Sequence, residues 1–445
     1  MVGMSYLAEI AQRIHKSVFL LSLMILSSTI SCGPAPTSAT VIIPTSTSTP
    51  FPTAQPTEPL EPTFPPSVTF TPFVSRGVIR IFSQSPLSGD HAFFGKDILH
   101  GAELAVLQLG GPLSALGYQM GLSSYDDRNA FETARSNAKT IAANPEILCG
   151  VGHYDSTITT ETSNIYHEAG LPIVVPSDTD AILTDRWYLE INRVIGRIDG
   201  QGKAGALFAK DQGFASTYII SANEENALKN AEYFRLDADR LGIQVLGMVI
   251  TSLTEENVRS IIGRLMDSRP DLVYISSPAS QAIPFLEEAR AAGYVGAFLG
   301  TEALNNPPLI NFAHPSLVDG GGMYYTITSP PASYYPEAAK FIADFKTYFD
   351  ASPLLFAARA YDAAGICLRA IEEASKAIGG GIPTRAQVAN AIRALKGYQG
   401  ITGTYTFNFQ GDPTLVRYYV YKVVYVDAAN WNQNYISAAY DVIPP

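Results

Sequence analysis

The residues best placed to do chemistry in this 445-residue chain are small hydroxyl side chains beside two predicted strand ends. Ser156 follows a strand predicted at 147–152 and begins a predicted helix, while Ser177 and Thr179 follow the next predicted strand. A helix start offers free N–H groups and the positive end of the helix dipole, which suit a carboxylate. Ligands of open α/β sheets bind at the carboxyl ends of strands, so we expect these residues on one edge. Helix capping is the alternative role for Ser156 and Thr179.

A carboxylate follows a strand in a later part of the chain. Glu302 comes directly after a strand predicted at 297–299. An acid at the carboxyl end of a strand can accept charge-assisted hydrogen bonds from an ammonium group. Together, Glu302 and the hydroxyl residues indicate a binding site for a zwitterion between two lobes. The alternative is an acid in a solvated loop.

Motifs of common enzymes are missing from the sequence, which contains no nucleophile elbow, HExxH or Walker A pattern. The nearest glycine-rich match, Gly150-Val151-Gly152, leads to Asp155, whose charge would repel a pyrophosphate. The six histidines lack metal-ligand spacing and no CxxC pair occurs. We therefore predict no enzyme activity, no cofactor and no metal site.

The charge balance excludes one class of partner. The chain has 30 Lys and Arg residues against 41 Asp and Glu residues, for a formal net charge of -11. Binding to nucleic acid phosphates requires a basic surface. We therefore predict no nucleic-acid partner.

The N-terminal segment is predicted to direct export. Residues 1–32 combine basic residues, an apolar run at 18–30 and Cys32 after small residues, which resembles a signal peptide with a lipobox. An ordinary secretory signal with an incidental cysteine is the alternative. In 33–75, 26 of 43 residues are Pro, Ser or Thr. Such a composition buries too little apolar surface to fold, so 33–76 is predicted to be a disordered tether.

Two further cysteines lie in apolar, periodic segments. Once Cys32 carries a lipid, only Cys149 and Cys367 remain, and three cysteines exclude a disulfide-rich scaffold. We predict both to be buried small hydrophobic residues.

Strand and helix patterns alternate through most of the remaining chain. Strands are predicted at 78–82, 119–125, 147–152, 172–175, 218–220, 245–250, 272–275 and 297–299, and helices at 131–143, 157–169, 226–241, 255–268 and 281–292. This βαβ repetition predicts mainly parallel sheets flanked by helices, in two lobes. Further helices are predicted at 336–349, 354–376 and 385–395. A β-hairpin is predicted from 404–409 and 417–426 around a turn at 411–413.

A set of short motifs, in order, carries a family resemblance. They are Pro86-Leu87-Ser88-Gly89, Phe94-Gly95, Gly101-Ala102-Glu103-Leu104-Ala105, Tyr125-Asp126-Asp127, Gly152-His153 before Ser156, Gly170-Leu171-Pro172, Pro176-Ser177-Asp178-Thr179, Gly300-Thr301-Glu302 and the closing Gly400, Gly403, Phe407 and Gly411-Asp412. Over about 77–427 the chain resembles the type I periplasmic substrate-binding proteins of ABC importers, in the leucine, isoleucine and valine branch. The resemblance implies a two-lobe α/β fold with the ligand between the lobes.

The resemblance also implies roles for individual residues. Ser156 and Thr179 would hold a ligand carboxylate, while the Ser177 carbonyl and Glu302 would hold its ammonium. Aromatic Phe94 and Tyr154 are similar to the family's side-chain walls. Two positions depart from the family: Asp155 replaces a small or apolar residue, and Asn226-Ala227 replaces Tyr-Gly. Asp155 either caps the helix or reaches a polar or cationic ligand side chain, which puts the branched-chain preference in doubt.

The implied protein is an extracytoplasmic, monomeric solute-binding protein, anchored to the cell membrane by a lipid on Cys32. It would capture an amino acid, branched-chain by resemblance, and deliver it to an ABC permease. The alternative is a sensor subunit for an amide or another small metabolite. The predicted first lobe is 77–195 plus about 327–400, and the second is 196–326 plus about 401–445.

Overall fold

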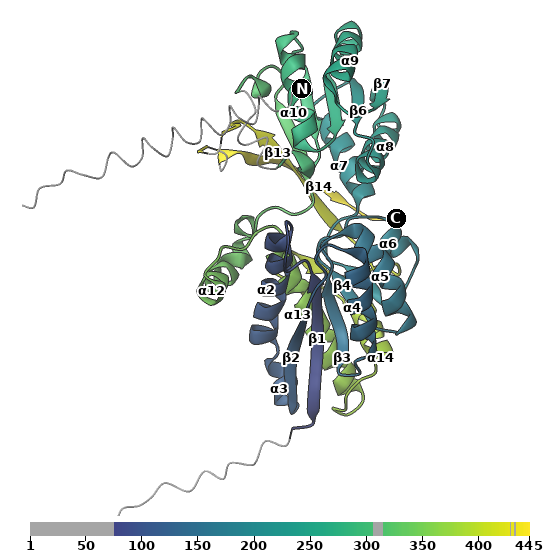
Figure 1. The fold of residues 1–445 in the computed structure, drawn as a ribbon, viewed down its shortest axis with the longest axis vertical. Helices are drawn as coiled ribbons and strands as arrows, with labels where there is room; N and C mark the ends of the chain where they lie inside the picture. Colours follow the sequence, from purple (N-terminus) through teal and green to yellow (C-terminus); the bar gives the residue numbers. More distant parts are fainter. Residues whose placement is uncertain (1–74, 306–314, 428, 431–432) are drawn as a thin grey trace, which may run out of the picture. The chain divides into compact units, whose positions relative to one another are not determined.

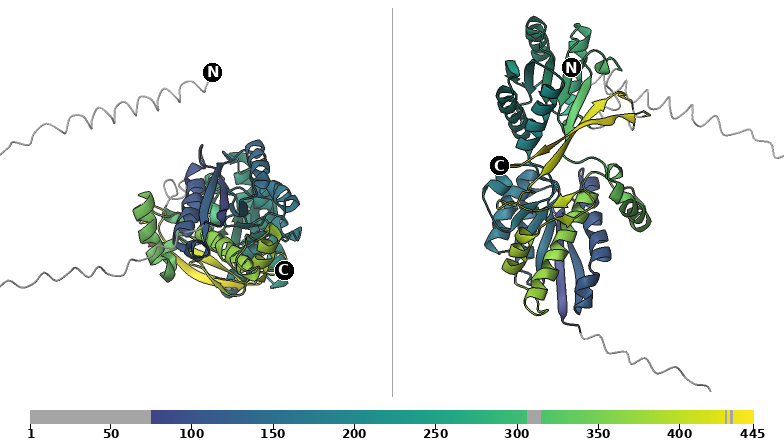
Figure 2. Two further views of the ribbon diagram at one scale, coloured as in Figure 1. Left: turned by 90° about the horizontal axis from the view of Figure 1, so that it is seen from below. Right: turned by 180° about the vertical axis from the view of Figure 1, so that it is seen from behind.

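The first of the two large sheets contains five parallel strands in the order β2-β1-β3-β4-β5 (Figure 1). Its strands are β1 (Gly77–Ser85), β2 (Tyr118–Asp126), β3 (Ile147–Gly152), β4 (Ile173–Val175) and β5 (Ile191–Arg193). Successive strand residues point to opposite faces, so Ile81 packs with helices α2 (Ala92–Leu109) and α13 (Ala357–Ala377), whereas Phe82 packs with α4 (Phe131–Ala143) and α5 (Ser156–Glu168). Figure 2 shows the yellow-green helices of 357–394 against this sheet.

The second sheet contains seven strands in the order β14-β13-β10-β9-β8-β6-β7. They are β6 (Ser216–Ser221), β7 (Gln244–Ile250), β8 (Leu272–Ser276), β9 (Ala297–Gly300), β10 (Met323–Ile327), β13 (Val416–Val423) and β14 (Tyr435–Val442). Only the pairings that involve β13 are antiparallel. Val273 faces α9 (Glu255–Ser268) and α10 (Ala279–Ala291), and Tyr274 faces α7 (Ile198–Asp211) and α8 (Glu225–Arg240).

These descriptions come from a computed structural model that describes residues 75–305, 315–427, 429–430 and 433–445. The predicted signal peptide, Cys32 and the tether up to residue 74 lie outside the described residues. Within the described ranges, no helix has the length and apolar character needed to span a membrane. We call each sheet with its helices a lobe, the first built on β1–β5 and the second on β6–β10, β13 and β14.

The two sheets confirm the predicted fold class. The helices at Phe131–Ala143 and Glu255–Ser268 and the strand at Ile147–Gly152 begin and end where the sequence pattern placed them. The residue boundaries predicted for the lobes stay a prediction. The remaining elements are α3 (Gly111–Ala115), α6 (Ile182–Asp185), α12 (Ala339–Phe349), α14 (Arg385–Ala394), β11 (Tyr398–Gln399), β12 (Thr404–Tyr405) and short 3-10 turns at Glu302–Leu304, Pro315–Val318, Ala332–Tyr334 and Pro336–Ala338.

Three connections join the lobes within the described ranges. The chain leaves the first sheet after β5, returns after β10, and leaves again between β12 and β13. We call these the first, second and third connections. The candidate site described below lies close to the first two.

The β-hairpin predicted around 411–413 is reduced to a single antiparallel bridge between Phe407 and Pro413, and the two predicted strands do not pair with each other. β12 pairs with β11 instead, and β13 pairs with β10 and β14 in the second sheet. Tyr405 and Phe407 are buried in the core of the first lobe. The alternating pattern in 404–409 and 417–426 therefore reflects two strand-like segments that pack in different lobes.

The two cysteines of the folded part are buried as predicted, but they are not separate small hydrophobic residues. Cys149 on β3 and Cys367 on α13 form a disulfide across 218 residues of sequence. The bond joins the central strand of the first lobe to the helix that covers it. Cysteine context alone could not show this pairing, because it depends on how α13 lies on the sheet.

Candidate ligand-binding site

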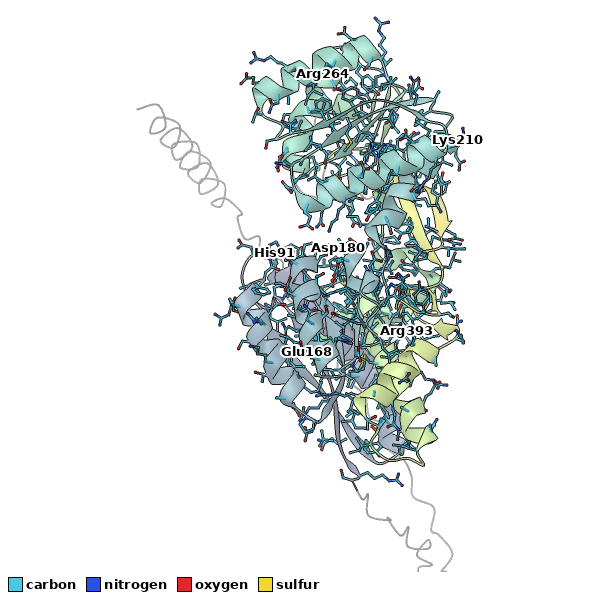
Figure 3. All side chains as sticks on the ribbon, turned by 90° about the vertical axis from the view of Figure 1, so that its right-hand side faces the viewer. His91, Glu168, Asp180, Lys210, Arg264 and Arg393 are labelled. Carbon is cyan, nitrogen blue, oxygen red and sulfur yellow. A yellow bond between two sulfur atoms is a disulfide. The ribbon has the colours of Figure 1, made fainter. Side chains whose placement is uncertain are left out.

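Two loops at one edge of the first sheet carry most of the predicted ligand-binding residues. β3 and β4 are parallel neighbours, so the loops that follow them, 154–156 and 177–179, leave the sheet side by side. The Ser177 hydroxyl donates to the His153 carbonyl, and the Tyr154 carbonyl lies 3.4 Å from the same hydroxyl. The structure thus brings Ser156, Ser177 and Thr179 to one edge. Figure 3 labels Asp180 and His91 on this side of the first lobe.

Asp155 caps the helix that begins in the first loop. Its Oδ1 accepts hydrogen bonds from the N–H groups of Thr157 at 2.9 Å and Ile158 at 3.1 Å, at the start of α5. A carboxylate at this position satisfies free N–H groups and favours the positive end of the helix dipole. Of the two roles left open by the sequence, capping is present in the structure. Contact between Asp155 and a ligand stays a prediction.

Asp178 is a buried acid that the sequence analysis did not select. Its carboxylate accepts a hydrogen bond from the Asp180 N–H at 2.8 Å and has the Ser156 side chain as a further hydrogen-bonding neighbour. Burial raises the pKa of Asp178 to about 6, against the opposing effect of Arg193. Asp178 is fully buried between two partly exposed neighbours, Ser177 and Thr179. The sequence carries no signal for this inward position, because Ser177, Asp178 and Thr179 are all polar and lie beyond the end of β4.

Arg193, at the end of β5, fixes the position of the loop at 177–179. Its guanidinium donates to the carbonyls of Asp178 at 3.0 Å and Asp180 at 2.8 Å, and its Nε lies 2.8 Å from the Asp412 carboxylate. The Arg193 and Asp412 side chains are both fully buried, and such a pair is tolerated only when further hydrogen bonds satisfy it. The backbone on either side of Thr179 is therefore rigidly positioned.

An aromatic cluster adjoins the loop after β3. Phe94 on α2 stacks against Tyr154 with ring centroids 5.1 Å apart. Phe356 meets both rings edge-on, at 5.6 Å from Phe94 and 6.0 Å from Tyr154. Burial raises the pKa of Tyr154, with a smaller contribution from Asp155. Phe94 and Tyr154 therefore form one surface, to which Phe356 adds a residue that the sequence did not suggest.

Glu302 follows the end of β9 in the second lobe after one intervening residue. It is partly buried, and its Oε2 accepts hydrogen bonds from the Thr328 N–H at 3.1 Å and the Thr328 hydroxyl at 3.0 Å. Burial raises the pKa of Glu302, while the bonds from Thr328 and the charge of Arg359 oppose that rise. Glu302 is thus an acid held in place by the residue after β10, and not one in a solvated loop.

Asn226 and Lys229 begin α8, also in the second lobe. Asn226 is exposed in the first turn. One turn further along, Lys229 forms ion pairs of 2.7 Å with Asp180 of the first lobe and 2.8 Å with Glu225. Burial opposes the charge of Lys229, but its two acidic partners raise its pKa overall. The sequence gave no indication of this pair, because Lys229 and Asp180 lie 49 residues apart and in different lobes.

A cavity of about 500 Å³ lies elsewhere, at the connections between the lobes. Its lining includes Val194, Tyr335, Arg359 and Tyr405, and none of the predicted ligand-binding residues. The candidate site therefore rests on the strand ends and their side chains. In the described part of the chain, no three His, Cys, Asp or Glu side chains converge as a metal ion would require.

The geometry and the sequence both lead to a family of binding proteins. The family model described as "Periplasmic binding protein" matches residues 79–429, which is most of the chain. This chain therefore belongs to the periplasmic binding protein family, whose members bind solutes and are not enzymes.

Relatives within that family are distant but similar over most of their length. A Leu/Ile/Val-binding protein homolog of Brucella melitensis is 23% identical over 355 residues, covering 79% of this chain and 91% of the relative. A Leu, Ile, Val, Thr and Ala-binding protein of Pseudomonas aeruginosa is 25% identical over 337 residues, covering 75% and 87%. Both alignments span the two lobes.

Solved structures share the fold. A leucine binding protein from Thermotoga maritima matches with a TM-score of 0.62 and 23% identity, covering 82% of this chain and 99% of that one. A solute binding protein from R. palustris in complex with benzoate matches with a TM-score of 0.62 and 18% identity, covering 83% and 98%. At these identities the likeness establishes the fold alone.

Proposed function

We propose that this chain captures an α-amino acid outside the cytoplasm and delivers it to an ABC permease. Membership of the periplasmic binding protein family supports solute binding. The Pseudomonas relative is named as a binding protein for leucine, isoleucine, valine, threonine and alanine, and the Brucella relative as a homolog of Leu/Ile/Val-binding proteins, which supports an amino acid of this type. Ligand capture and release, and not covalent chemistry, is the function.

The observation that carries this proposal is the chemistry of the strand ends in the two lobes. In the first lobe, Ser156 at the start of α5 and Thr179 after β4 present hydroxyl donors suited to a carboxylate. In the second lobe, Glu302 presents an acceptor suited to an ammonium, with the Ser177 carbonyl as its first-lobe counterpart. A zwitterion can bond to both lobes through its two charged groups, whereas a simple acid or amine can bond to only one lobe.

Capture then follows because a bound ligand favours the closed arrangement of the lobes over the open one. A ligand that contacts both lobes binds the closed arrangement more tightly than the open one, so it shifts the population towards closure. Closure removes water from the Glu302–ammonium contact, which strengthens a charge-assisted hydrogen bond. The closed form is the one that a permease would recognise.

The disulfide between Cys149 and Cys367 supports an extracytoplasmic location, because such bonds persist in oxidising compartments. Anchoring by a lipid on Cys32 is part of the proposal. Cell fractionation of a Cys32→Ala variant tests it: the variant should move to the soluble fraction. Retention in the membrane fraction would contradict the lipid anchor.

Calorimetric titration with three matched compounds tests the ligand class. L-leucine carries both charged groups, 4-methylpentanoate lacks the ammonium, and 3-methylbutylamine lacks the carboxylate. We expect binding of L-leucine and loss of most of that affinity for either analogue. Equal affinity for 4-methylpentanoate would contradict a zwitterion site. Mass spectrometry of the small molecule that copurifies with the chain would identify the natural ligand directly.

An aromatic carboxylate is a second candidate. The stacked surface of Phe94, Tyr154 and Phe356 suits a flat ring, and the R. palustris structure is in complex with benzoate. Benzoate has no ammonium, so its binding should not depend on Glu302. Tighter binding of benzoate than of L-leucine, unaffected by Glu302→Gln, would favour this candidate.

A further inference from the structure

Arg359 is a buried arginine of α13 that joins two connections between the lobes. Its guanidinium donates to the Thr328 carbonyl at 2.7 Å, to the Ser329 hydroxyl at 2.7 Å and to the Val194 carbonyl. Val194 directly follows β5 in the first connection, and Thr328 directly follows β10 in the second. Only 5% of Arg359 is exposed, so these carbonyls and this hydroxyl replace the water that its charge would otherwise require.

The same helix also holds the turn between β11 and β12, just before the third connection begins. Asp362, one turn beyond Arg359, accepts hydrogen bonds from the N–H groups of Ile401 at 2.6 Å and Thr402 at 2.8 Å. Tyr405, at the end of β12, lies with its hydroxyl 3.4 Å from the Val194 carbonyl. One turn of α13 therefore contacts the first two connections and the turn that leads into β12, ahead of the third.

Thr328 links this network to the candidate site. Its carbonyl accepts from Arg359, while its N–H and hydroxyl donate to Glu302. A single residue thus stands between the Arg359 guanidinium and the carboxylate proposed to bind the ligand ammonium. Rotation of the second connection would displace Thr328 and, with it, the hydrogen bonds that orient Glu302.

We propose that Arg359 is a positioning residue: it fixes Thr328 so that Glu302 faces the ligand, and it couples ligand binding to movement at the connections. This inference rests on the proposed function, in which Glu302 binds an ammonium. Arg359 itself does not touch the ligand. Its role differs from that of a general structural arginine, which would affect stability but not the Glu302 contact.

Arg385 provides a matched control for that distinction. It also donates through a partly buried guanidinium to backbone carbonyls, those of Ile147 at 3.0 Å, Ala142 at 2.8 Å and Asn144 at 2.6 Å. All of these carbonyls belong to the first lobe. Arg359→Lys and Arg385→Lys each keep the charge and remove the planar set of donors, so both should lower thermal stability.

The first measurement needs no ligand. Hydrogen exchange of the ligand-free chain, followed by mass spectrometry, reports on the backbone N–H of Thr328 and its neighbours. We expect faster exchange in the peptide covering 323–331 for Arg359→Lys and unchanged exchange there for Arg385→Lys. Unchanged exchange in both variants would overturn the positioning role, whatever the ligand.

The second measurement is calorimetric titration with L-leucine. Arg359→Lys should weaken binding about tenfold, while Arg385→Lys should stay within about twofold of wild type. In a Glu302→Gln background the effect of Arg359→Lys should fall below about threefold, because the contact that it positions is already lost. An equal loss in both backgrounds would overturn the coupling.

Two further outcomes distinguish the positioning role of Arg359 from the proposed amino-acid ligand. If Arg359→Lys does not fold, Thr328→Val removes the hydroxyl bound to Glu302 and should weaken L-leucine binding in the same Glu302-dependent manner. A loss that persists in the Glu302→Gln background would overturn the link. If wild type fails to bind L-leucine while the exchange result holds, the positioning of Thr328 stands and the proposed amino-acid ligand fails.

Discussion

The two lobes would present a ligand with surfaces built in different ways. The first lobe offers the neutral hydroxyls of Ser156 and Thr179 and the carbonyl of Ser177, while the start of α5 is capped by Asp155. The second lobe offers one carboxylate, Glu302. Neutral hydrogen bonds contribute about 1 kcal/mol each and can replace one another, whereas a lone charge has no substitute. Removing one group from the first lobe should therefore weaken ligand binding only in part, whereas removing Glu302 from the second lobe should remove most of the affinity.

The hydrogen bonds that hold these two surfaces in place also differ. The loops of the first lobe are tied within that lobe, by Ser177 to His153 and by Arg193 to the carbonyls of Asp178 and Asp180. Glu302 is tied to Thr328, at a connection between the lobes. The first surface is thus fixed mainly by its own lobe, while the second depends on a connection between the lobes.

Replacement of Glu302 tests this contrast most strongly. Glu302→Gln removes the charge opposite the ligand ammonium, and breaking such a buried pair costs about 2–5 kcal/mol. L-leucine affinity should fall by about 30-fold to several thousand-fold. Calorimetric titration measures the loss, with Glu288→Gln on the exposed side of α10 as a control. Binding within about threefold of wild type would remove the basis for a zwitterion site.

Removal of the disulfide tests the rigidity of the first lobe. Cys149→Ala combined with Cys367→Ala should lower the free energy of unfolding by about 2–5 kcal/mol, because the bond restricts the unfolded chain. Urea denaturation measures this value, and Cys32→Ala should leave it unchanged. Reactive thiols at both positions in the denatured, non-reduced wild type would show that the bond does not form.

Replacement of Thr179 should have a smaller effect than that of Glu302. Thr179→Ala removes one hydroxyl and leaves the backbone donors around it in place, so the loss should be about 1–3 kcal/mol. Titration with L-leucine and with 4-methylpentanoate should show a similar loss for both, since both carry the carboxylate. A loss as large as that of Glu302→Gln would make the first lobe as dependent on one group as the second.

Replacement of Asp155 separates capping from ligand contact. As a cap, its removal in Asp155→Ala should lower stability by about 0.5–2 kcal/mol and leave the ligand preference unchanged. Thermal unfolding and titration with leucine, lysine and glutamine measure the two effects. A shift of preference from lysine or glutamine towards leucine would show that Asp155 contacts the ligand side chain.

The smallest expected effect is the pH dependence of binding. Burial raises the pKa of Glu302, and only the ionised form attracts an ammonium. Affinity for L-leucine should therefore fall as the pH is lowered from about 7 to 5, by at most about tenfold per pH unit. Glu302→Gln should flatten this dependence. A wild-type affinity that rises on acidification would contradict the proposed role of Glu302.

Local sequence patterns were sufficient to predict most of the helices and strands and the sheet edge that carries Ser156, Ser177 and Thr179. The helix at Phe131–Ala143 and the strand at Ile147–Gly152 matched because periodicity and burial act over a few neighbouring residues. The same patterns brought Ser156, Ser177 and Thr179 to one edge, since strand ends of a parallel sheet coincide. Strand partners were less predictable, as β12 and β13 show, because alternation does not specify the neighbouring strand.

By itself the sequence determined the α/β class, the order of most elements and the residue types at the strand ends, because these depend on short-range patterns and composition. Only the tertiary structure decided that Cys149 meets Cys367, that Lys229 pairs with Asp180, and that Arg359 contacts two connections. Each of these contacts joins residues far apart along the chain. Their partners are set by the packing of whole helices on sheets, which no local pattern encodes.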